Sequence, residues 1–398
     1  MESTLAWLDF NAAERERTQR VLALFEERDT RDELGLGGIR DSFSDHLFPG
    51  TSTIQTRLRY MFFVPWIYLR LERQRVPSRE IGARARKLEL DLTNPLLAED
   101  DNAGVFGRLA KGQLKRLPSS VYWAGLRHYG ICHYPGGRDD YHRDLDSIYR
   151  RRDHARKEND GGREAYQFTW HPKLPSAPGN FLTEPSFAVT REEALFFKDC
   201  LMVRCSGSLL TFLAWHSEAA DVNFPWEHPR LAEFSDAHKE MLEHARLFSE
   251  VTHGAAVMYN LLLAEARGRS DWAADYRDVL DDWQDRINRE RRRIREWNLQ
   301  RFWDVARHPS HTITFRTREF VEAWIRLSLD NSDGLAQNAE ARRLIRDREI
   351  RLKGPRSRFQ NQRALEQWGG AAGLRPVSFR WHNAVTFLKD LTEALVNS

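Results

Sequence analysis

A run of cationic side chains near the C-terminal end is the strongest chemical signal in this sequence. Residues 342–363 include nine Arg and Lys residues but only two acidic ones, Asp347 and Glu349. That local excess is larger than the formal net charge of +3 of the whole chain, so the remaining residues are slightly acidic. A concentrated basic face is the usual footprint of a polyanion, and guanidinium groups suit bidentate contacts to phosphate. We expect DNA or RNA to bind through Arg346, Arg351, Lys353, Arg356, Arg358 and Arg363.

A second basic segment lies in the N-terminal half and contains no acidic residue; its cations are Arg108, Lys111, Lys115 and Arg116. A Leu-Pro-Ser-Ser sequence follows, which predicts a new helix that begins near Ser119 and Ser120. With a preceding helix expected at residues 79–92, this order suits a helix-turn-helix or winged-helix unit in which the two serines open the recognition helix. The alternative is a plain three-helix bundle, which gives the same pattern.

A third segment, PGTST at residues 49–53, combines glycine with hydroxyl side chains just before a strongly apolar stretch. Unpaired amides and hydroxyl donors at such a helix start attract anions. The residues of this candidate anion site are Thr51, Ser52, Thr53, Gln55 and Arg57. The alternative is an ordinary cap in which Arg57 forms an internal salt bridge with Asp41 or Asp45. The lysine that a Walker loop requires is missing.

The sequence contains no complete catalytic, metal-binding or cofactor-binding motif. Glu250 and His253 have the spacing of one half of a di-iron site, but the second copy that such a site needs is missing. The three cysteines form no C-x-x-C pair, and the sequence contains neither HEXXH nor GxSxG. We therefore expect no metal, no cofactor and no catalytic residues, and we favour a protein that is not an enzyme.

The elements that position these residues are mainly helical. Residues 54–71 are apolar around most of the circumference, which predicts a buried central helix, and Pro65 predicts a kink or a break after Val64. Further helices are expected at residues 12–28, 79–92, 104–115, 119–129, 191–215, 236–267, 272–306, 317–329, 336–352, 360–368 and 381–396.

Proline and glycine concentrate between the two helical parts. We therefore predict an N-terminal helical domain at residues 1–132 and a C-terminal one at residues 190–398. They are separated by a long irregular loop at residues 133–189, whose middle part, residues 150–163, is expected to be mobile. No apolar run approaches the length of roughly 20 residues that a membrane helix needs, so we expect a cytoplasmic protein without a membrane partner.

Three runs carry a resemblance that extends over most of the chain: PGTSTIQTRLRYMFFVPWIYL, LKRLPSSVYWAGLRHYGI and RFQNQRALEQWGG. They resemble the signatures of an uncharacterised bacterial family known only as a domain of unknown function. The resemblance implies an association with loci that encode helicase-like and phospholipase-D-like proteins, a setting typical of anti-phage defence. It implies no catalytic residues.

Together these observations predict a non-enzymatic, nucleic-acid-binding accessory subunit of a bacterial anti-phage defence system. It would contact phosphates through its Arg-rich surfaces and work beside a helicase-like or nuclease-like protein. Two alternatives stay open: a structural subunit that mediates protein assembly, and a small-ligand sensor or unrecognised enzyme built around Thr51 to Arg57.

Overall fold

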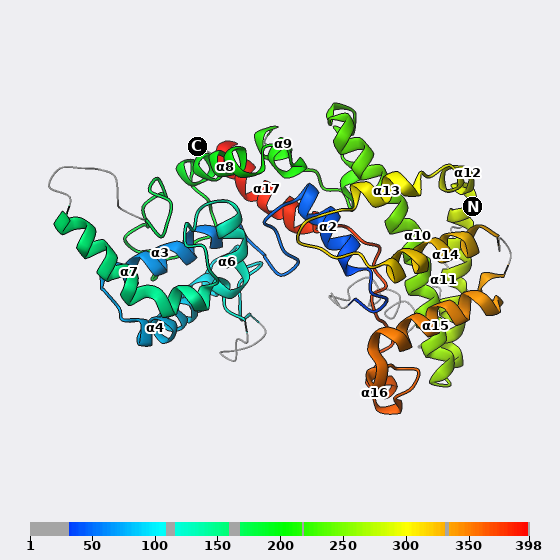
Figure 1. The fold of residues 1–398 in the computed structure, drawn as a ribbon. Coiled ribbons are helices and arrows are strands. Elements are labelled where there is room, and N and C mark those ends of the chain that lie inside the picture. The colour runs from blue at the N-terminus through cyan, green and yellow to red at the C-terminus, as the bar shows by residue number, and fades with distance from the viewer. Residues whose placement is uncertain (1–31, 109–115, 159–167, 217–218, 331–333, 397–398) are drawn as a thin grey trace, which may run out of the picture. The chain divides into compact units, whose positions relative to one another are not determined.

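The computed structural model describes residues 32–108, 116–158, 168–216, 219–330 and 334–396. Helices dominate these residues, which contain two isolated β-bridges but no strand (Figure 1). The prediction of a mainly α protein is confirmed. Among the described residues, no helix combines the length and the apolar character that crossing a membrane requires. The helix expected at residues 12–28 lies outside the described residues.

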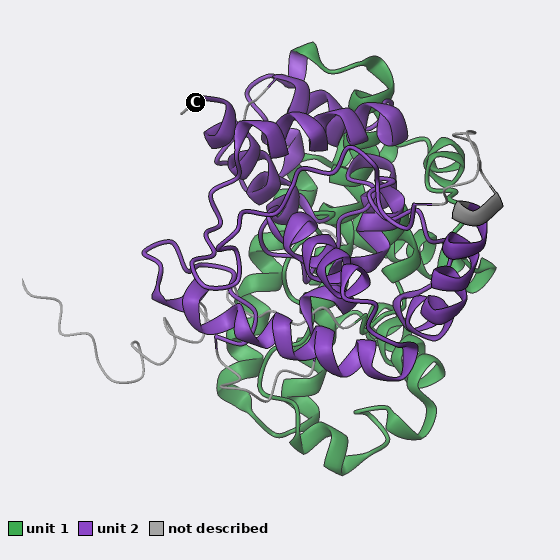
Figure 2. Ribbon diagram, turned by 90° about the vertical axis from the view of Figure 1, so that its left-hand side faces the viewer, with its two compact units in different colours: residues 1–43, 233–379 green, residues 44–232, 380–398 purple. Residues whose placement is uncertain are grey.

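The packing divides the chain into two compact units (Figure 2). Unit 1 comprises residues 1–43 and 233–379, and unit 2 comprises residues 44–232 and 380–398. This division differs from the predicted domains, because the last helix belongs to the same unit as N-terminal segments. Within unit 2 that helix, α17 (Trp381–Val396), packs against α8 (Arg191–Cys205) and α9 (Leu209–His216).

Unit 1 is organised around the long helix α10 (Asp236–Ala266), whose start is capped by the Ser235 hydroxyl. Its packing partners are α11 (Ser270–Arg289), α14 (Phe315–Asp330) and α15 (Ala339–Lys353). The shorter elements are α12 (Arg291–Arg295), α13 (Leu299–Val305), η3 (Leu335–Gln337), η4 (Gly354–Arg356) and α16 (Gln362–Glu366), and α2 (Gly37–Leu47) contributes its first residues.

The close packing of α10 on α11 depends on Gly254. The indole of Trp283 fills the space beside this glycine, so a Cβ atom placed there would lie 2.3 Å from the ring. Trp283 also stacks on Trp324, and their indole N–H groups donate to consecutive carbonyls of α10. The two rings are buried, and each is fixed by its hydrogen bond and by the stack, which leaves them little room to move.

We expect the Gly254→Ala variant to lose about 1–3 kcal/mol of stability. The added methyl overpacks the core, and this destabilisation is larger than the stabilisation from the higher helix propensity of alanine. Urea denaturation of the full chain measures this. Gly207→Ala is the matched control, since a Cβ at Gly207 has no atom within 4 Å. Equal unfolding midpoints for the two variants would contradict the packing described here.

Unit 2 is built on the buried helix α3 (Tyr60–Arg73), which packs against α4 (Ser78–Asp91) and α6 (Pro118–His128). The helix α7 (Arg138–Glu158) lies against α4. The remaining elements of this unit are α5 (Thr93–Ala98), η1 (Pro225–Glu227) and η2 (Leu231–Glu233), of which the last reaches the boundary with unit 1.

Several predicted boundaries differ from the structure. The buried helix begins at Tyr60 rather than Ile54, and it runs through Pro65 without a break after Val64. A proline removes one backbone donor, and the burial of the flanking side chains outweighs that single loss. The single helix predicted at residues 272–306 is divided into α11, α12 and α13.

The predicted irregular loop at residues 133–189 contains the helix α7, so the prediction does not hold for residues 138–158. Of the segment expected to be mobile, residues 150–158 are helical, and the remainder lies outside the described residues. The side chains of Tyr141, Leu145 and Ile148 follow helical spacing and are buried, which explains why the segment folds despite its many charges.

Candidate nucleic-acid interface

Helix α15 carries the first part of the predicted cationic cluster and has one clearly buried face. Asn338 caps its start by accepting a hydrogen bond from the Ala341 N–H group. Ala341, Ile345 and Glu349 follow at four-residue intervals and are all buried. The opposite face therefore points to solvent, and Arg343, Arg346 and Arg351 are exposed on it.

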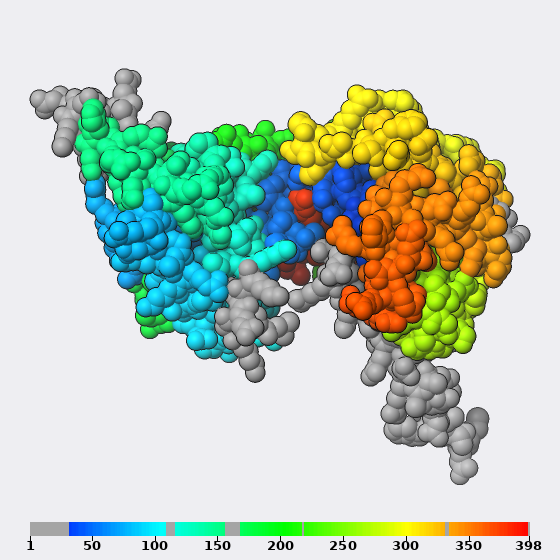
Figure 3. Space-filling view, turned by 60° about the horizontal axis from the view of Figure 1, so that its bottom comes forward, coloured from blue at the N-terminus to red at the C-terminus, as the bar shows by residue number. Residues whose placement is uncertain are grey.

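Four of the six predicted contact residues reach the surface: Arg346, Arg351, Arg356 and Arg363. We call this set the arginine surface. None of the four guanidinium groups forms an ion pair within the described part of the chain, while Arg346 lies 5.1 Å over the ring of Phe359. In Figure 3 the segments that carry them, α15 to α16, are orange and face the viewer. Within the described residues no carboxylate neutralises these four cations, which is the condition that binding of a polyphosphate requires.

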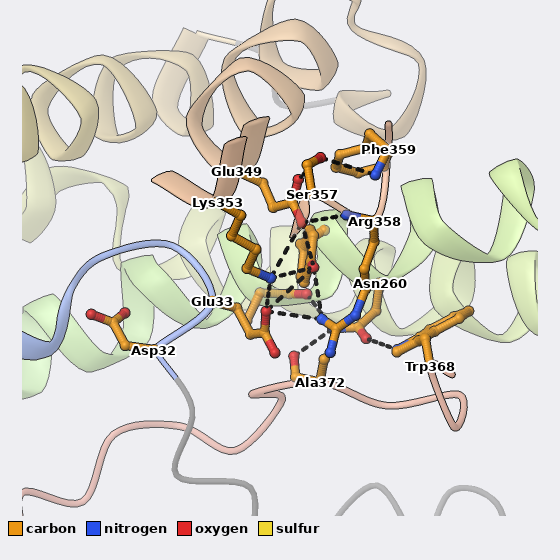
Figure 4. Close-up of polar contacts among 12 residues, drawn as sticks. Asp32, Glu33, Asn260, Glu349, Lys353, Ser357, Arg358, Phe359, Trp368 and Ala372 are labelled. Carbon is orange, nitrogen blue, oxygen red and sulfur yellow. Dashed lines mark hydrogen bonds and ion pairs between the residues drawn. The ribbon is translucent and has the colours of Figure 1, made fainter. Parts of the chain in front are cut away.

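Lys353 and Arg358 behave differently, because both point inward to carboxylates (Figure 4). The Arg358 guanidinium lies 2.8 Å from Glu33, and the Lys353 ammonium pairs with both Glu33 and Glu349. Burial raises the pKa of Glu33, but the hydrogen bond from Lys353 and the charge of Arg358 outweigh it and hold the pKa below its ordinary value. The expectation that these two cations stand free for phosphate does not hold.

Glu349 is the centre of this internal network, and its side chain is fully buried. Its carboxylate accepts hydrogen bonds from the Ser357 hydroxyl and from the Arg358 backbone N–H at 2.9 Å. Tyr259 lies at the same place, where its hydroxyl accepts from Arg358 at 2.8 Å. The network fixes the turn after α15 and so positions the segment that contains Arg356.

Two further arginines of the cluster bind groups of the protein itself. Arg348 is buried and donates to the carbonyls of Leu34, Gly35 and Arg316 and to the Thr317 hydroxyl. Burial lowers the pKa of Arg348 below its ordinary value. Arg342 pairs with Glu265. The charge of the cluster is therefore smaller at the surface than the sequence suggests.

The structure describes only part of the second basic segment, so the predicted recognition surface stays a prediction. Arg108 and Arg116 are exposed, whereas Lys111 and Lys115 lie outside the described residues. Ser119 is buried; its N–H donates to Glu89 at 2.7 Å, and its hydroxyl accepts from Arg138.

The helix that follows is also mostly turned inward. Ser120 is exposed, but Tyr122 and Trp123 of α6 are buried in unit 2. A recognition helix needs its first turns free to enter a groove. The burial of these side chains favours the plain bundle that the sequence left open.

The candidate anion site is filled by the protein's own groups. The Thr51 hydroxyl donates to the Phe48 carbonyl at 2.6 Å, and the Gln55 amide bridges Ser52 N–H and Gly50 carbonyl. The Ser52 hydroxyl is buried and Thr53 is exposed. The Thr51 hydroxyl and the Gln55 amide therefore point at backbone acceptors, whereas the buried Ser52 hydroxyl has no hydrogen-bond partner among the described residues.

Arg57 completes this internal arrangement, and its partners are not those expected. Its guanidinium binds Asp390 at 2.8 Å and Asp101 at 2.6 Å, whereas Asp45 binds Arg380. Burial raises the pKa of Asp390 despite the hydrogen bond and the charge of Arg57. An anion at this position would have to displace both carboxylates, so the predicted site is corrected to a structural salt bridge.

Sequence reasoning missed the acidic residues that neutralise the cluster, chiefly Glu33. It lies in a loop, 320 residues before Lys353 in the chain. No periodicity or motif around it indicates a buried partner. The helical spacing of Ile345 and Glu349 was a usable signal for the buried face, since an acid at an apolar phase predicts a paired, buried carboxylate.

Comparison with known proteins gives one match. No curated protein and no solved structure matches the chain. A family model described as a family of unknown function, DUF6361, matches residues 2–395, which is almost the full length. The protein therefore belongs to the DUF6361 family.

Proposed function

We propose that the protein binds nucleic acid through the arginine surface of unit 1. The observation that carries this proposal is the presence of four exposed guanidinium groups without carboxylate partners in the described residues, all within one short segment. Guanidinium groups contact phosphate in pairs of parallel hydrogen bonds, and each neutralised phosphate releases a counterion. The proposal differs from the sequence-based expectation in leaving out Lys353 and Arg358, whose charges are compensated by Glu33 and Glu349.

The internal network supports this proposal indirectly. Because Glu349 holds the Ser357 hydroxyl and the Arg358 N–H, the loop after α15 has a defined conformation before any ligand arrives. A preformed loop loses less conformational entropy on binding than a loose one. The wider role as an accessory subunit of an anti-phage defence system rests on the family resemblance alone, and it stays part of the proposal.

The test is the salt dependence of binding. We expect a labelled DNA duplex to bind the full chain at about 50 mM salt and to lose affinity steeply by about 200 mM. In the Arg351→Glu/Arg356→Glu variant the slope of log K against log salt should fall by about 2, because two phosphate contacts are lost. Fluorescence anisotropy measures both quantities, and a single-stranded RNA probe run in parallel identifies the preferred nucleic acid.

The matched control is Lys87→Glu/Arg191→Glu, which reverses two exposed cations of unit 2 and leaves the arginine surface intact. It should retain the wild-type slope. Reversal of Arg358 is unsuitable, because it would place a carboxylate against Glu33 inside unit 1. Equal slopes for the two double variants, or no binding at low salt, would reject the proposal and favour a structural subunit.

A further inference from the structure

The arginine surface has a neighbouring segment that the proposed function does not use. Helix α14 packs against α15 (Figure 1), and its first two residues, Phe315 and Arg316, are exposed. The Arg348 guanidinium of α15 joins the two helices: one terminal nitrogen donates to the Arg316 carbonyl, and the other donates to the Gly35 carbonyl. The start of α14 therefore lies beside the helix that carries the first part of the arginine surface.

Phe315 presents an aromatic ring to solvent. It is 72% exposed, which exceeds the exposure of every other Phe, Tyr and Trp residue that the structure describes. No other ring contacts it within those residues. Thr314 caps the first turn of α14, because its hydroxyl accepts from the Thr317 N–H at 3.2 Å, so the backbone under the ring is fixed. A single exposed aromatic residue is ordinary on a protein surface, so the neighbours of Phe315 decide what the ring can bind.

The neighbours of this ring are two exposed cations, Arg316 and Arg351, and neither forms an ion pair in the part of the chain that the structure describes. Burial lowers the pKa of Arg348, and the nearby charge of Arg351 adds to that effect. Leu352 is 43% exposed, and it lies against Gly35, where a Cβ atom would be 2.9 Å from Leu352 and 2.7 Å from the Arg348 guanidinium. Exposed apolar and cationic side chains therefore lie together around the buried Arg348.

A second flat group belongs to the arginine surface itself. The Arg346 guanidinium is 5.1 Å over the Phe359 ring, and that ring contacts Tyr259 edge to face with 5.9 Å between the ring centroids. The Phe359 N–H also donates to the Ser357 hydroxyl at 3.1 Å, which fixes the backbone at the ring. Arg346 is exposed, so its guanidinium stays accessible from the solvent side. Guanidinium planes stack on bases as aromatic rings do.

The two forms of nucleic acid differ in what they offer to such groups. A duplex presents its phosphates outward and keeps its bases paired and stacked, so except at its ends it has no base face for Phe315. A single strand has free base faces, which stack on aromatic side chains and on arginine planes, while its phosphates bind the surrounding cations. Unpaired cations beside accessible flat groups are therefore the composition that suits a single strand.

We infer that the arginine surface binds single-stranded nucleic acid, with phosphates on the arginines and one base stacked on Phe315. The inference rests on the proposed function and names the form of the nucleic acid. A duplex shares the phosphate contacts, so it binds the same surface without the stacked base. Discrimination between the two forms therefore depends on an uncharged side chain rather than on the arginines.

Fluorescence anisotropy of the full chain at about 50 mM salt tests the inference. The probes are single-stranded DNA, single-stranded RNA and a DNA duplex, all labelled and of equal length. At least one single strand should bind about ten-fold more tightly than the duplex, because it adds a stacked base. A duplex that binds as tightly as both single strands would overturn the inference and leave the proposed function intact. Absence of binding by all three probes would reject both.

Phe315→Ala locates the stacked base. This variant should bind the preferred single strand about ten-fold more weakly and the duplex like the wild type, with an unchanged salt slope because no charge is removed. Phe315→Trp keeps a flat ring and should retain the wild-type affinity. Phe315 is exposed, so neither change disturbs the core. Wild-type affinity of Phe315→Ala for the single strand would overturn the inference.

Trp215→Ala is the matched control. Trp215 is an aromatic residue of α9 in unit 2, is 56% exposed and does not belong to the arginine surface. Its removal should change neither affinity. Equal weakening of single-strand and duplex binding by Phe315→Ala would overturn the inference, because the two probes do not share a stacked base. So would equal weakening by Trp215→Ala and Phe315→Ala, because the stacking would then not be specific to the start of α14.

Discussion

Replacing Glu349 by alanine is expected to lower the free energy of unfolding of unit 1 by about 3–5 kcal/mol, because the change breaks a buried ion pair. The substitution removes a fully buried carboxylate. The Ser357 hydroxyl and the Arg358 N–H then lose their acceptor, and the Lys353 ammonium loses one of its two partners. Differential scanning calorimetry of the full chain should show the main transition several degrees lower.

Glu366→Ala is the control for this prediction. Glu366 lies at the end of the short helix α16, is exposed, and among the described residues accepts a hydrogen bond from Gln362 alone. Such a surface contact contributes within about 0.5 kcal/mol. If Glu349→Ala and Glu366→Ala unfold at the same temperature, the network around Glu349 does not hold the loop after α15, and the argument for a preformed arginine surface is lost.

The helices that the sequence predicted best are those whose signal is local. The expected ranges 236–267, 317–329 and 381–396 agree closely with α10, α14 and α17. Their apolar spacing and their caps both depend on residues that are close together in the sequence. Helix α7 was missed because proline, glycine and charge around it suggested a loop, although its buried residues keep helical spacing.

The candidate interface was only partly predictable. Arg346 and Arg348 are two positions apart, yet one is exposed and the other is buried. Helix phase explains this difference, and the positions of Ala341 and Ile345 already contained that information. The pairing of Lys353 and Arg358 with Glu33 depends on a contact between distant parts of the chain, which neither composition nor spacing encodes.

The same limit applies to the predicted anion site. Arg57 on an apolar stretch correctly indicated a buried cation that needs a partner. Its partner Asp390 lies on the last helix, 333 residues away, and nearby acids such as Asp45 were the natural but incorrect choice. Sequence reasoning therefore identified which charges require compensation, while the fold determined what compensates them.

The contribution of Glu89 to stability should fall as pH rises from about 4.5 to about 7, by about 1.4 kcal/mol for each pH unit. It is obtained as the difference between the wild type and a variant without this carboxyl, because partly buried histidines such as His142 and His253, whose pKa is lowered, titrate in the same range with the opposite sign. The Glu89 side chain is 2% exposed, and burial raises its pKa from 4.5 to about 7. The hydrogen bond from Ser119 N–H and the charges of Arg138 and Arg86 oppose this shift only in part.

The sign follows from which state holds the proton more tightly. In the folded protein Glu89 keeps its proton up to about pH 7, whereas the unfolded chain releases it near its ordinary pKa of 4.5. The stabilising contribution is complete below the unfolded pKa and is lost as pH rises through the folded one. The total loss is on the order of 3 kcal/mol.

Glu89→Gln removes the titration and keeps an amide oxygen that accepts the Ser119 N–H. Urea denaturation measures the free energy of unfolding of the wild type and of this variant between about pH 4.5 and 8. The difference between the two free energies should therefore change between about pH 4.5 and 7 and stay constant above that range. The exposed substitution Glu99→Gln should follow the wild type throughout. Parallel pH profiles for Glu89→Gln and the wild type would show that Glu89 is ionised in the folded protein at low pH, which requires water or a cation beside its carboxylate.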